Sequence, residues 1–191
     1  MDVMNAQGSG RMAAATGARA EGSARPARAI TSEGSAPLLG DGRVSLRKAN
    51  ANDRELIWEW TFSSDLRALM RPMRVVLYKD YERWLFLRLA DRQTPLWVIE
   101  EAGARSGVVL IDRHDKQALP RLSMVVSPRQ RGRGLGRRAL ALLCAQWQHP
   151  LIAEAFADNL AAVRSLEAAG FGRANERRHD GKVICTYLWS P

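Results

Sequence analysis

A basic, glycine-rich turn between an apolar segment and a helical segment constrains this chain more than any other feature. It lies within residues 125–136, which read VVSPRQRGRGLG. Glycine lets the backbone bend tightly and approach a ligand closely, and the first N–H groups of the helix that follows have no partner within that helix. Such N–H groups bind phosphate oxygens. The turn therefore predicts a diphosphate site, to which Arg131 and Arg133 add positive charge.

The glycine spacing differs from that of the two common nucleotide-binding loops. A P-loop requires Gly-x-x-x-x-Gly-Lys-Ser/Thr, and a dinucleotide fingerprint requires Gly-x-Gly-x-x-Gly. Here Gly132, Gly134 and Gly136 fall at every second position, and no Lys-Ser/Thr pair follows. Because short glycine patterns also occur by chance, the turn alone is equally consistent with a tight connection that carries a solvated charged face.

The pattern Arg131-x-x-Gly134-x-Gly136 resembles the coenzyme A loop of the GNAT superfamily of N-acetyltransferases. The likeness extends from residue 43 to the C-terminus and is strongest over 122–172. The family's Asn-x-x-Ala…Gly-Phe block is matched downstream by Asn159, Ala162, Gly170 and Phe171. The resemblance implies a mixed α/β (α+β) sheet with the GNAT acyl-CoA N-acyltransferase fold.

The same resemblance implies the chemistry and the cosubstrate, acetyl-CoA. In this family acetyl-CoA lies where the strand before the loop separates from the next strand, and a free amine attacks the thioester without a covalent enzyme intermediate. Backbone N–H groups near Val126 are expected to polarise the thioester carbonyl. The residues that the resemblance assigns to coenzyme binding are Val126, Arg131, Gly132, Arg133, Gly134, Leu135, Gly136 and Asn159.

The general acid does not carry over from the family. Many members have a tyrosine seven residues after the asparagine, and this chain has Leu166 there. Water, Ser165, Tyr187 or Tyr78 can protonate the departing thiolate instead, and the sequence does not choose among them.

Glu154 is the first candidate for the general base. It lies five residues before Asn159, in the register of the base glutamate of bacterial protein N-terminal acetyltransferases of this superfamily. A strand carboxylate paired with an arginine explains Glu154 equally well. Asp112 and His114, which follow the apolar segment 108–111, are the alternatives, and the ordinary pKa of histidine suits a base.

The first 42 residues differ in composition from the rest. They are rich in Ala, Gly, Ser, Arg and Pro, and such segments cannot bury enough apolar surface to fold. We therefore expect a disordered tail over 1–42 and a single domain over 43–191. An organelle targeting segment or an overlong gene start explains the same composition.

Apolar periodicity and turn residues predict the order of elements in the domain. The order is strand, two helices, three strands, helix, strand, helix and hairpin, which is the order of the GNAT fold. The expected segments are a strand at 44–48, helices capped by Asn52 or Asp53 and from about Asp80, strands at 97–100, 107–111 and 122–126, a helix at 137–148, a strand at 151–157, a helix at 159–169 and strands around the turn Asp180-Gly181.

Charge favours an anionic partner. The chain has 29 basic and 20 acidic residues, a net charge of +9, and the charges of the expected tail cancel. Coenzyme A, a nucleotide-linked sugar and a nucleic acid all satisfy this balance. We expect no nucleic-acid partner, because no aromatic-rich strand accompanies the basic residues.

The cysteines and the hydropathy of the chain exclude further classes of function. Cys144 and Cys185 are far apart and have no further ligand at metal-binding spacing, so we expect packing residues in a reducing compartment and no metal. A thiol nucleophile is the less favoured interpretation, since no base is near either cysteine in the sequence. No apolar run reaches the ~20 residues of a membrane span, so we expect a cytoplasmic protein.

The N-terminal half of the domain bears on the acceptor. Trp58-x-Trp60, Asp65-Leu66-Arg67, Trp84 and residues 96–100 resemble bacterial amino-sugar N-acetyltransferases of pseudaminic acid and surface-polysaccharide pathways. The chain departs from their pattern at residues 61–63 and at Tyr81, where those enzymes carry Arg-Asn-Asp and histidine. Core packing explains the three tryptophans as well.

Three functions stay open. The first is an acetyltransferase acting on a small amine, most of all a nucleotide-linked amino sugar. The second is a protein N-terminal acetyltransferase of the ribosomal-protein type, and the third is a non-catalytic module that binds coenzyme A. The sequence does not give the oligomeric state.

Overall fold

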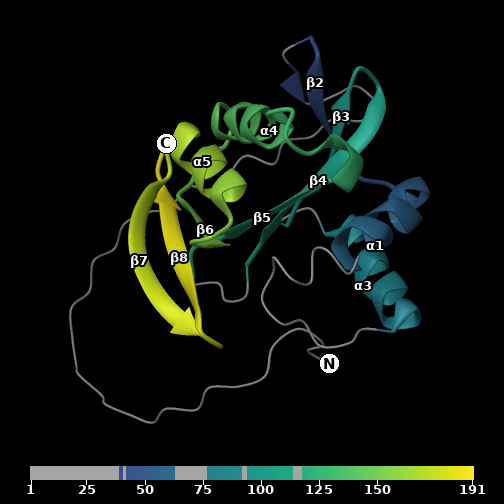
Figure 1. The fold of residues 1–191 in the computed structure, drawn as a ribbon. Helices are drawn as coiled ribbons and strands as arrows, with labels where there is room; N and C mark the ends of the chain where they lie inside the picture. Colours follow the sequence, from purple (N-terminus) through teal and green to yellow (C-terminus); the bar gives the residue numbers. More distant parts are fainter. Residues whose placement is uncertain (1–38, 41, 63–76, 92–93, 114–117) are drawn as a thin grey trace, which may run out of the picture. The chain divides into compact units, whose positions relative to one another are not determined.

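The computed structural model describes residues 39–40, 42–62, 77–91, 94–113 and 118–191. Eight strands in these ranges form one mixed sheet in the order β1-β2-β3-β4-β5-β6-β8-β7 (Figure 1). The strands are β1 (Leu39–Gly40), β2 (Val44–Lys48), β3 (Leu96–Glu101), β4 (Ala104–Asp112), β5 (Arg121–Val126), β6 (Leu151–Phe156), β7 (Gly172–His179) and β8 (Lys182–Trp189). The helices are α1 (Arg54–Phe62), α3 (Tyr78–Ala90), α4 (Leu135–Cys144) and α5 (Leu160–Ala168). This confirms the predicted α/β fold and its order of elements.

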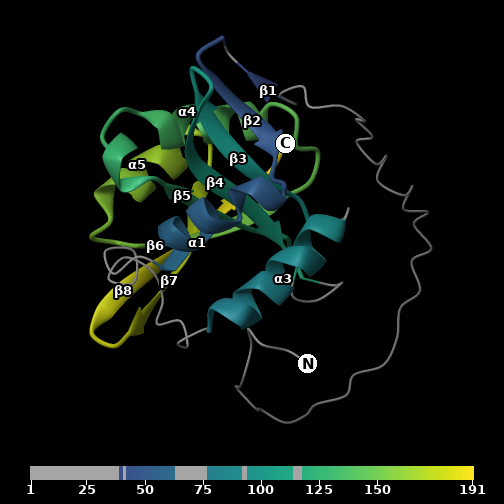
Figure 2. The same cartoon turned by 90° about the vertical axis from the view of Figure 1, so that its right-hand side faces the viewer.

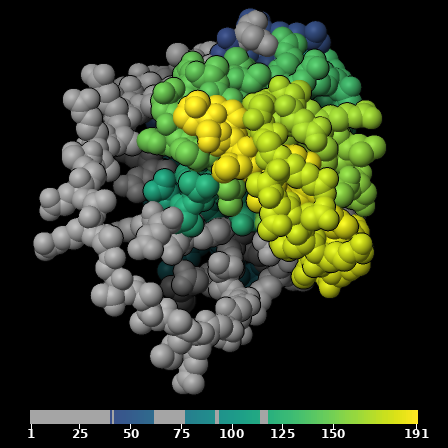
Figure 3. All heavy atoms as spheres, turned by 90° about the vertical axis from the view of Figure 1, so that its left-hand side faces the viewer, coloured from purple at the N-terminus to yellow at the C-terminus, as the bar shows by residue number. Residues whose placement is uncertain are grey.

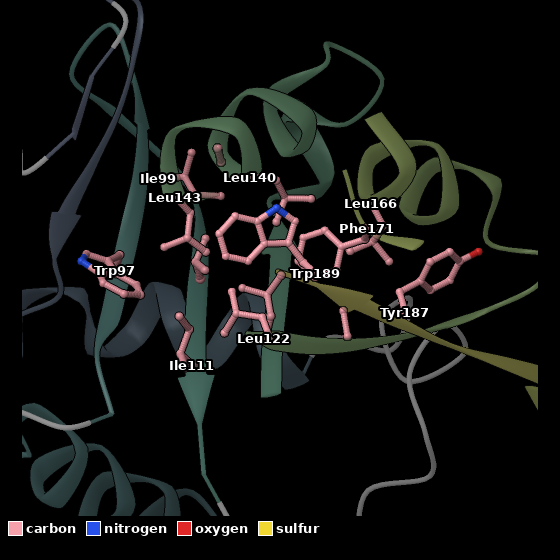
Figure 4. Packing of buried hydrophobic residues seen from close by; sticks show 14 of the residues in the cluster. Trp97, Ile99, Ile111, Leu122, Leu140, Leu143, Leu166, Phe171, Tyr187 and Trp189 are labelled. Atoms are coloured by element: carbon pink, nitrogen blue, oxygen red, sulfur yellow. The ribbon is translucent and has the colours of Figure 1, made fainter. Parts of the chain in front are cut away.

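Two apolar clusters attach helices to opposite faces of the sheet. Side chains alternate along β4, so Val109 and Ile111 pack with α4 and α5, whereas Val108 packs with α1 and α3. Figures 1 and 2 show the two pairs of helices on the two sides. In Figure 4, Trp189 of β8 lies at the centre of the cluster under α4 and α5. The cluster under α1 and α3 contains residues of β3, β4 and β5 and, in the described ranges, none from β6 to β8.

The C-terminal hairpin forms one end of the sheet. β7 is exposed over nearly its whole length, and Figure 3 shows the hairpin, in yellow, at the surface. Asp180 and Gly181 connect the strands with positive φ angles of 47° and 75°, as the predicted turn requires. β7 is an edge strand rich in arginine, and charged side chains discourage pairing with another chain at such an edge.

Helix α1 begins at Arg54, directly after Asp53, as the sequence predicts, but a 3₁₀ turn that the sequence did not reveal precedes it. Asn50 caps this turn: its side chain accepts from the Asn52 N–H at 2.9 Å. The Asp53 carboxylate accepts from the Asn50 N–H at 2.9 Å, which completes a capping box. A 3₁₀ turn over Ala51–Asp53 then leads into α1. The reciprocal pairing of Asn50 and Asp53 closes this turn.

Two differences concern segment ends. Leu39 and Gly40, which we assigned to the tail, pair with β2; the rest of residues 1–42, apart from Gly42, lies outside the described residues. Helix α4 ends at Cys144, four residues before the predicted end at Gln148.

In the described part of the chain, no helix is long and apolar enough to cross a membrane.

A buried ion network joins β2 and β3 to the start of α1. Asp53 is 1% exposed and accepts two bonds from Arg47, both at 2.8 Å, while Arg47 also donates to Glu100 at 2.7 Å. Burial alone would raise the pKa of Asp53, but the bonds from Arg47 and the Asn50 N–H outweigh it and lower the pKa. The hydrogen bond to Asp53 in turn raises the pKa of Arg47.

We expect Asp53→Asn to destabilise the fold by about 3 kcal/mol at pH 7, because it removes the charge that compensates a largely buried Arg47. The pKa of Asp53 is lower in the folded than in the unfolded state, where it is about 3.9. The stabilisation is therefore complete above the unfolded-state pKa and is lost as pH falls through the folded-state pKa. Thermal unfolding at several pH values measures it.

The matched control is Glu55→Gln, a carboxylate in the same region whose side chain is 84% exposed. We expect it to change stability by less than about 0.5 kcal/mol. A difference between wild type and Asp53→Asn that stays constant from pH 7 to pH 3 contradicts the role assigned to the carboxylate.

Candidate functional site

Strands β5 and β6 separate in the middle of the sheet. They are parallel and pair only through Arg121 with Ile152 and Leu122 with Ala153. On its other edge β5 stays paired with β4 through Val126. The two strands therefore diverge toward their C-terminal ends, as the resemblance implied.

This divergence leaves a backbone donor of β5 facing the gap. The Ser127 N–H donates to the carbonyl of Ser106 in β4 at 2.9 Å. Because consecutive N–H groups of a strand point to opposite edges, the Val126 N–H points away from β4, toward β6. Pairing with β6 ends at Leu122, so the Val126 N–H is placed to bind a carbonyl oxygen between the strands.

The glycine-rich turn connects β5 to α4, and its glycines have two different roles. Gly132 and Gly134 have φ angles of 76° and 75°, which disfavour other residues, and a Cβ at either would meet no atom within 4 Å. Gly136 instead permits close packing, because a Cβ there would lie 3.0 Å from the Met124 side chain. The first two glycines thus leave open space over the turn, and the third seats α4 against β5.

The N-terminus of α4 presents donors toward this open space. Its first intrahelical bond runs from the Arg138 N–H to the Gly134 carbonyl at 3.1 Å. The N–H groups of Leu135, Gly136 and Arg137 therefore have no acceptor within the helix. The side chain of Leu135 is buried and fixes the first turn in the core. Free N–H groups and the positive end of the helix dipole favour an anion here.

The two arginines of the turn are held by the protein. Arg131 donates from Nε to the Val126 carbonyl at 3.2 Å, and its side chain is otherwise exposed. Arg133 contacts Gln130 and lies 3.0 Å from a carboxylate oxygen of Glu101, whose side chain is 6% exposed. Glu101 also binds Arg43 at 3.0 Å. The sequence did not reveal Glu101 as the partner of Arg133, because the two lie in different elements.

Asn159 caps helix α5. Its Oδ1 accepts from the Ala162 N–H at 3.2 Å, and Gly170, with a φ of 87°, ends the helix before the buried Phe171. Local structure thus accounts for the Asn-x-x-Ala…Gly-Phe block. The part that the resemblance gives Asn159 in coenzyme binding stays a prediction.

Glu154 forms an ion pair with two arginines. Arg121 donates to its Oε2 at 2.5 Å and Arg177 to its Oε1 at 3.2 Å. This geometry agrees with the interpretation of Glu154 as a strand carboxylate paired with arginine. Its role as a base stays a prediction. Sequence reasoning missed both arginines, since their pairing with Glu154 depends on strand register and no motif marks it.

The other two candidate bases are Asp112 and His114. Asp112 binds Arg88 of α3 at 2.9 Å and is paired across the sheet with Arg121. His114 lies outside the described residues.

The substitutes proposed for the general acid differ in position. Ser165 lies next to Gly136, 3.7 Å from the position of a Cβ there, and donates to the Ala161 carbonyl at 2.7 Å. Leu166 and Tyr187 are buried in the core, and burial raises the pKa of Tyr187. Tyr78 of α3 is exposed. Ser165 is therefore the one of these hydroxyl groups that lies beside the glycine turn.

Burial raises the pKa of the Cys144 thiol to about 11, which keeps it protonated near neutral pH. Cys185 is buried in the core. Neither thiol has the environment of a nucleophile. In the ranges that the structure describes, no group of three or more His, Cys, Asp and Glu residues is arranged to hold a metal ion.

The three tryptophans of the N-terminal half lie around α1 and α3. Trp60 is 4% exposed and belongs to the core, which confirms the packing interpretation for that residue. Trp58 and Trp84 are half-buried; the Trp58 ring centroid lies 5.0 Å from that of Tyr81, and Arg88 stacks over Trp84 at 5.5 Å.

Comparison with known proteins extends these observations. Residues 43–172 match the family model described as an acetyltransferase (GNAT) domain. The fold is similar to that of spermidine N-acetyltransferase from Vibrio cholerae in complex with CoA and spermine, with 14% identity, 78% of this chain and 96% of that chain covered, and a TM-score of 0.67.

Two further solved structures are similar. One is yncA from Salmonella typhimurium with acetyl-CoA, with 22% identity, 78% and 94% coverage and a TM-score of 0.66. The other is RimL, a ribosomal L7/L12 alpha-N-protein acetyltransferase in complex with CoA, with 12% identity, 78% and 94% coverage and a TM-score of 0.66. No curated protein sequence matches the chain.

We expect acetyl-CoA to raise the melting temperature, since a ligand bound only by the folded state stabilises it by about 2.7 kcal/mol at a hundredfold excess over Kd. Gly134→Asp should abolish this shift, because it places a side chain and a negative charge in the open space over the turn. Thermal unfolding with and without millimolar acetyl-CoA measures both effects.

Gly181→Asp is the matched control, since Gly181 also has a φ of 75° and open space around it but lies in the β7–β8 turn. We expect similar destabilisation of this variant and a normal shift with acetyl-CoA. Equal shifts in the two variants contradict binding at the glycine turn.

Proposed function

This chain belongs to the acetyltransferase (GNAT) domain family, and from that membership we propose that it transfers an acetyl group from acetyl-CoA to a primary amine by direct attack on the thioester. The observation that carries the proposal is the divergence of β5 and β6 beside the glycine turn at the start of α4. The similar proteins are bound to CoA or acetyl-CoA in their own structures, which supports the same cosubstrate here.

The chain has groups suited to each part of acetyl-CoA. The open space over Gly132 and Gly134 and the N–H groups at the start of α4 suit the diphosphate. The Val126 N–H suits the thioester oxygen, where a fixed donor stabilises the charge that develops during attack. The backbone edge of β5 that β6 leaves unpaired can donate to the extended arm of the coenzyme.

For the acceptor we propose a small amine, in particular a nucleotide-linked amino sugar. The segments around Trp58 and Trp84 resemble those of amino-sugar N-acetyltransferases, which supports this choice. The net charge of +9 also supports it, because a positive charge favours an anionic, nucleotide-linked substrate. Both tryptophans are half-buried, so part of each ring can still face a ligand.

The second candidate acceptor is the N-terminal amine of a protein. The position of Glu154 relative to Asn159 favours it, and the similar RimL structure is a protein acetyltransferase. A series of short peptides with free and blocked N-termini separates this acceptor from an amino sugar.

We place proton removal from the amine on Glu154, directly or through a water molecule, with Asp112 and His114 as alternatives. Glu154 follows Ala153, the last residue of β6 that pairs with β5. Its carboxylate therefore leaves the sheet where the strands begin to diverge, on the face opposite α4. The general acid is water or Ser165.

A thiol-release assay with acetyl-CoA tests the proposed function. The acceptors are free amino sugars, their nucleotide-linked forms, simple amines and peptides. Release that depends on one class of amine identifies the acceptor. Absence of release with every acceptor, while acetyl-CoA still raises the melting temperature, contradicts the enzyme and supports the non-catalytic module.

If Glu154 is the base, Glu154→Gln should lower kcat by a factor of about 10² to 10⁴. The loss should shrink as pH rises toward the pKa of the acceptor amine, because the amine then arrives deprotonated. The shift of melting temperature with acetyl-CoA should persist. Steady-state kinetics from pH 6 to about pH 9.5 measure the effect.

Glu167→Gln, on the exposed side of α5, is the control and should leave kcat unchanged. Near-normal turnover of Glu154→Gln at neutral pH contradicts the assignment and moves the role to Asp112 or His114.

A further inference from the structure

We infer that Arg121 and Arg177 bind a negatively charged group of the acceptor, so that the preferred acceptor is an amine that carries a phosphate or a carboxylate. The inference rests on the proposed function. It adds the sign of the charge that the acceptor carries and the residues that bind the charged group.

The two arginines lie where the strands diverge, on the face that α4 does not cover. Leu122 packs in the cluster under α4 and α5, so the preceding residue, Arg121, points to the opposite face. Arg177 is paired with Ile184 of β8 and reaches the same face, since both arginines bind Glu154. The cluster under α1 and α3 stops at β5 in the described ranges.

Among the described residues, the cluster around the divergence carries more positive than negative charge. The ion pairs between described residues are Arg88 with Asp112, Arg121 with Glu154 and Arg177 with Glu154, and these five side chains are three cations and two anions. Each oxygen of Glu154 already accepts from a different arginine. A second cationic group of the acceptor, beyond the reacting amine, would therefore meet carboxylates that are already paired.

The arginines have donors to spare. Each guanidinium has five N–H groups. The Nε of Arg121 is buried and, in the described part of the chain, has no hydrogen-bond partner. An unsatisfied buried donor is unfavourable. The side chains of Arg121 and Arg177 are 27% and 36% exposed, so a ligand can reach them.

Guanidinium groups suit an anion in particular. They bind carboxylates and phosphates through paired N–H donors, and such charge-assisted bonds are stronger than neutral ones. A diphosphate-linked amino sugar has this chemistry, whereas a polyamine would meet three arginines. The acceptor is thus expected to differ from the spermine in the similar Vibrio cholerae structure.

Matched amines test the inference. In the sugar series we compare glucosamine, which has no anionic group, with glucosamine 6-phosphate and uridine diphosphate glucosamine. In the short series we compare ethanolamine with phosphoethanolamine and with β-alanine, which carries a carboxylate. Spermidine represents the polycations. We expect kcat/KM to be about tenfold or more higher for the anionic member of a series, since a bond to a charged group has roughly this effect. The preference should fall as salt rises. The phosphate and carboxylate arms distinguish the two kinds of anion.

Arg177→Gln assigns the preference to the cluster. We expect it to raise KM for the anionic acceptor about tenfold more than KM for the neutral amine, whereas any change in kcat through the contact of Arg177 with Glu154 should be the same for both acceptors. Arg178→Gln is the matched control, because it removes the same charge from the next residue of β7, opposite Val183, which packs on the α4 side. It should leave both acceptors unchanged, and both variants should keep the stabilisation by acetyl-CoA.

Several outcomes overturn the inference. Equal or better turnover of neutral amines or spermidine overturns it while the proposed function stands. An equal loss for anionic and neutral amines in Arg177→Gln also overturns it, because the arginine would then act only by holding Glu154. If no amine is acetylated, the proposed function itself fails.

Discussion

The loss of pairing between β5 and β6 beyond Leu122 and Ala153 is the constraint on which the site depends. A sheet normally satisfies the N–H and C=O groups of its inner strands with neighbouring strands. Here the β4 edge of β5 stays paired to Val126, while its other edge is left open in the middle of an eight-stranded sheet. Such an opening is stable only if something else satisfies the exposed backbone, and an extended ligand with polar groups can do so.

The helices around the opening hold it in place. Helix α4 packs closely against β5 at Gly136 and is anchored by the buried Leu135, and these contacts hold its N-terminus beside the divergence. The ion pair of Glu101 with Arg133 connects β3 to the glycine turn. The ion pairs of Glu154 connect β6 to β5 and to β7. These partly buried pairs fix geometry more than they add stability, because desolvation offsets much of their attraction. The site is thus preorganised on rigid elements, which favours catalysis by positioning.

Sequence periodicity and local motifs predicted most of the fold. The strands, the β7–β8 turn and the glycine turn all depend on neighbouring residues, and the chain carries their signals at short range. The sequence placed the start of α1 next to Asp53 but missed the 3₁₀ turn before it, because Asn50, Asn52 and Asp53 all suit a capping position. The tryptophans could not be assigned from spacing, because burial of Trp60 depends on which face of the sheet α1 covers.

The charged residues of the site were predictable only in part, for a physical reason. Arg121 lies 33 residues from Glu154, and Arg177 lies 23 residues from it, so their contact depends on the order and register of β5, β6, β8 and β7. A one-residue slip of any of these strands would move its side chain to the α4 face. The same register that opens the sheet for a coenzyme therefore also gathers the arginines on the opposite face. If these arginines bind the acceptor as we propose, single substitutions on β5 or β7 would change the preferred acceptor while the glycine turn and α4 stay as they are.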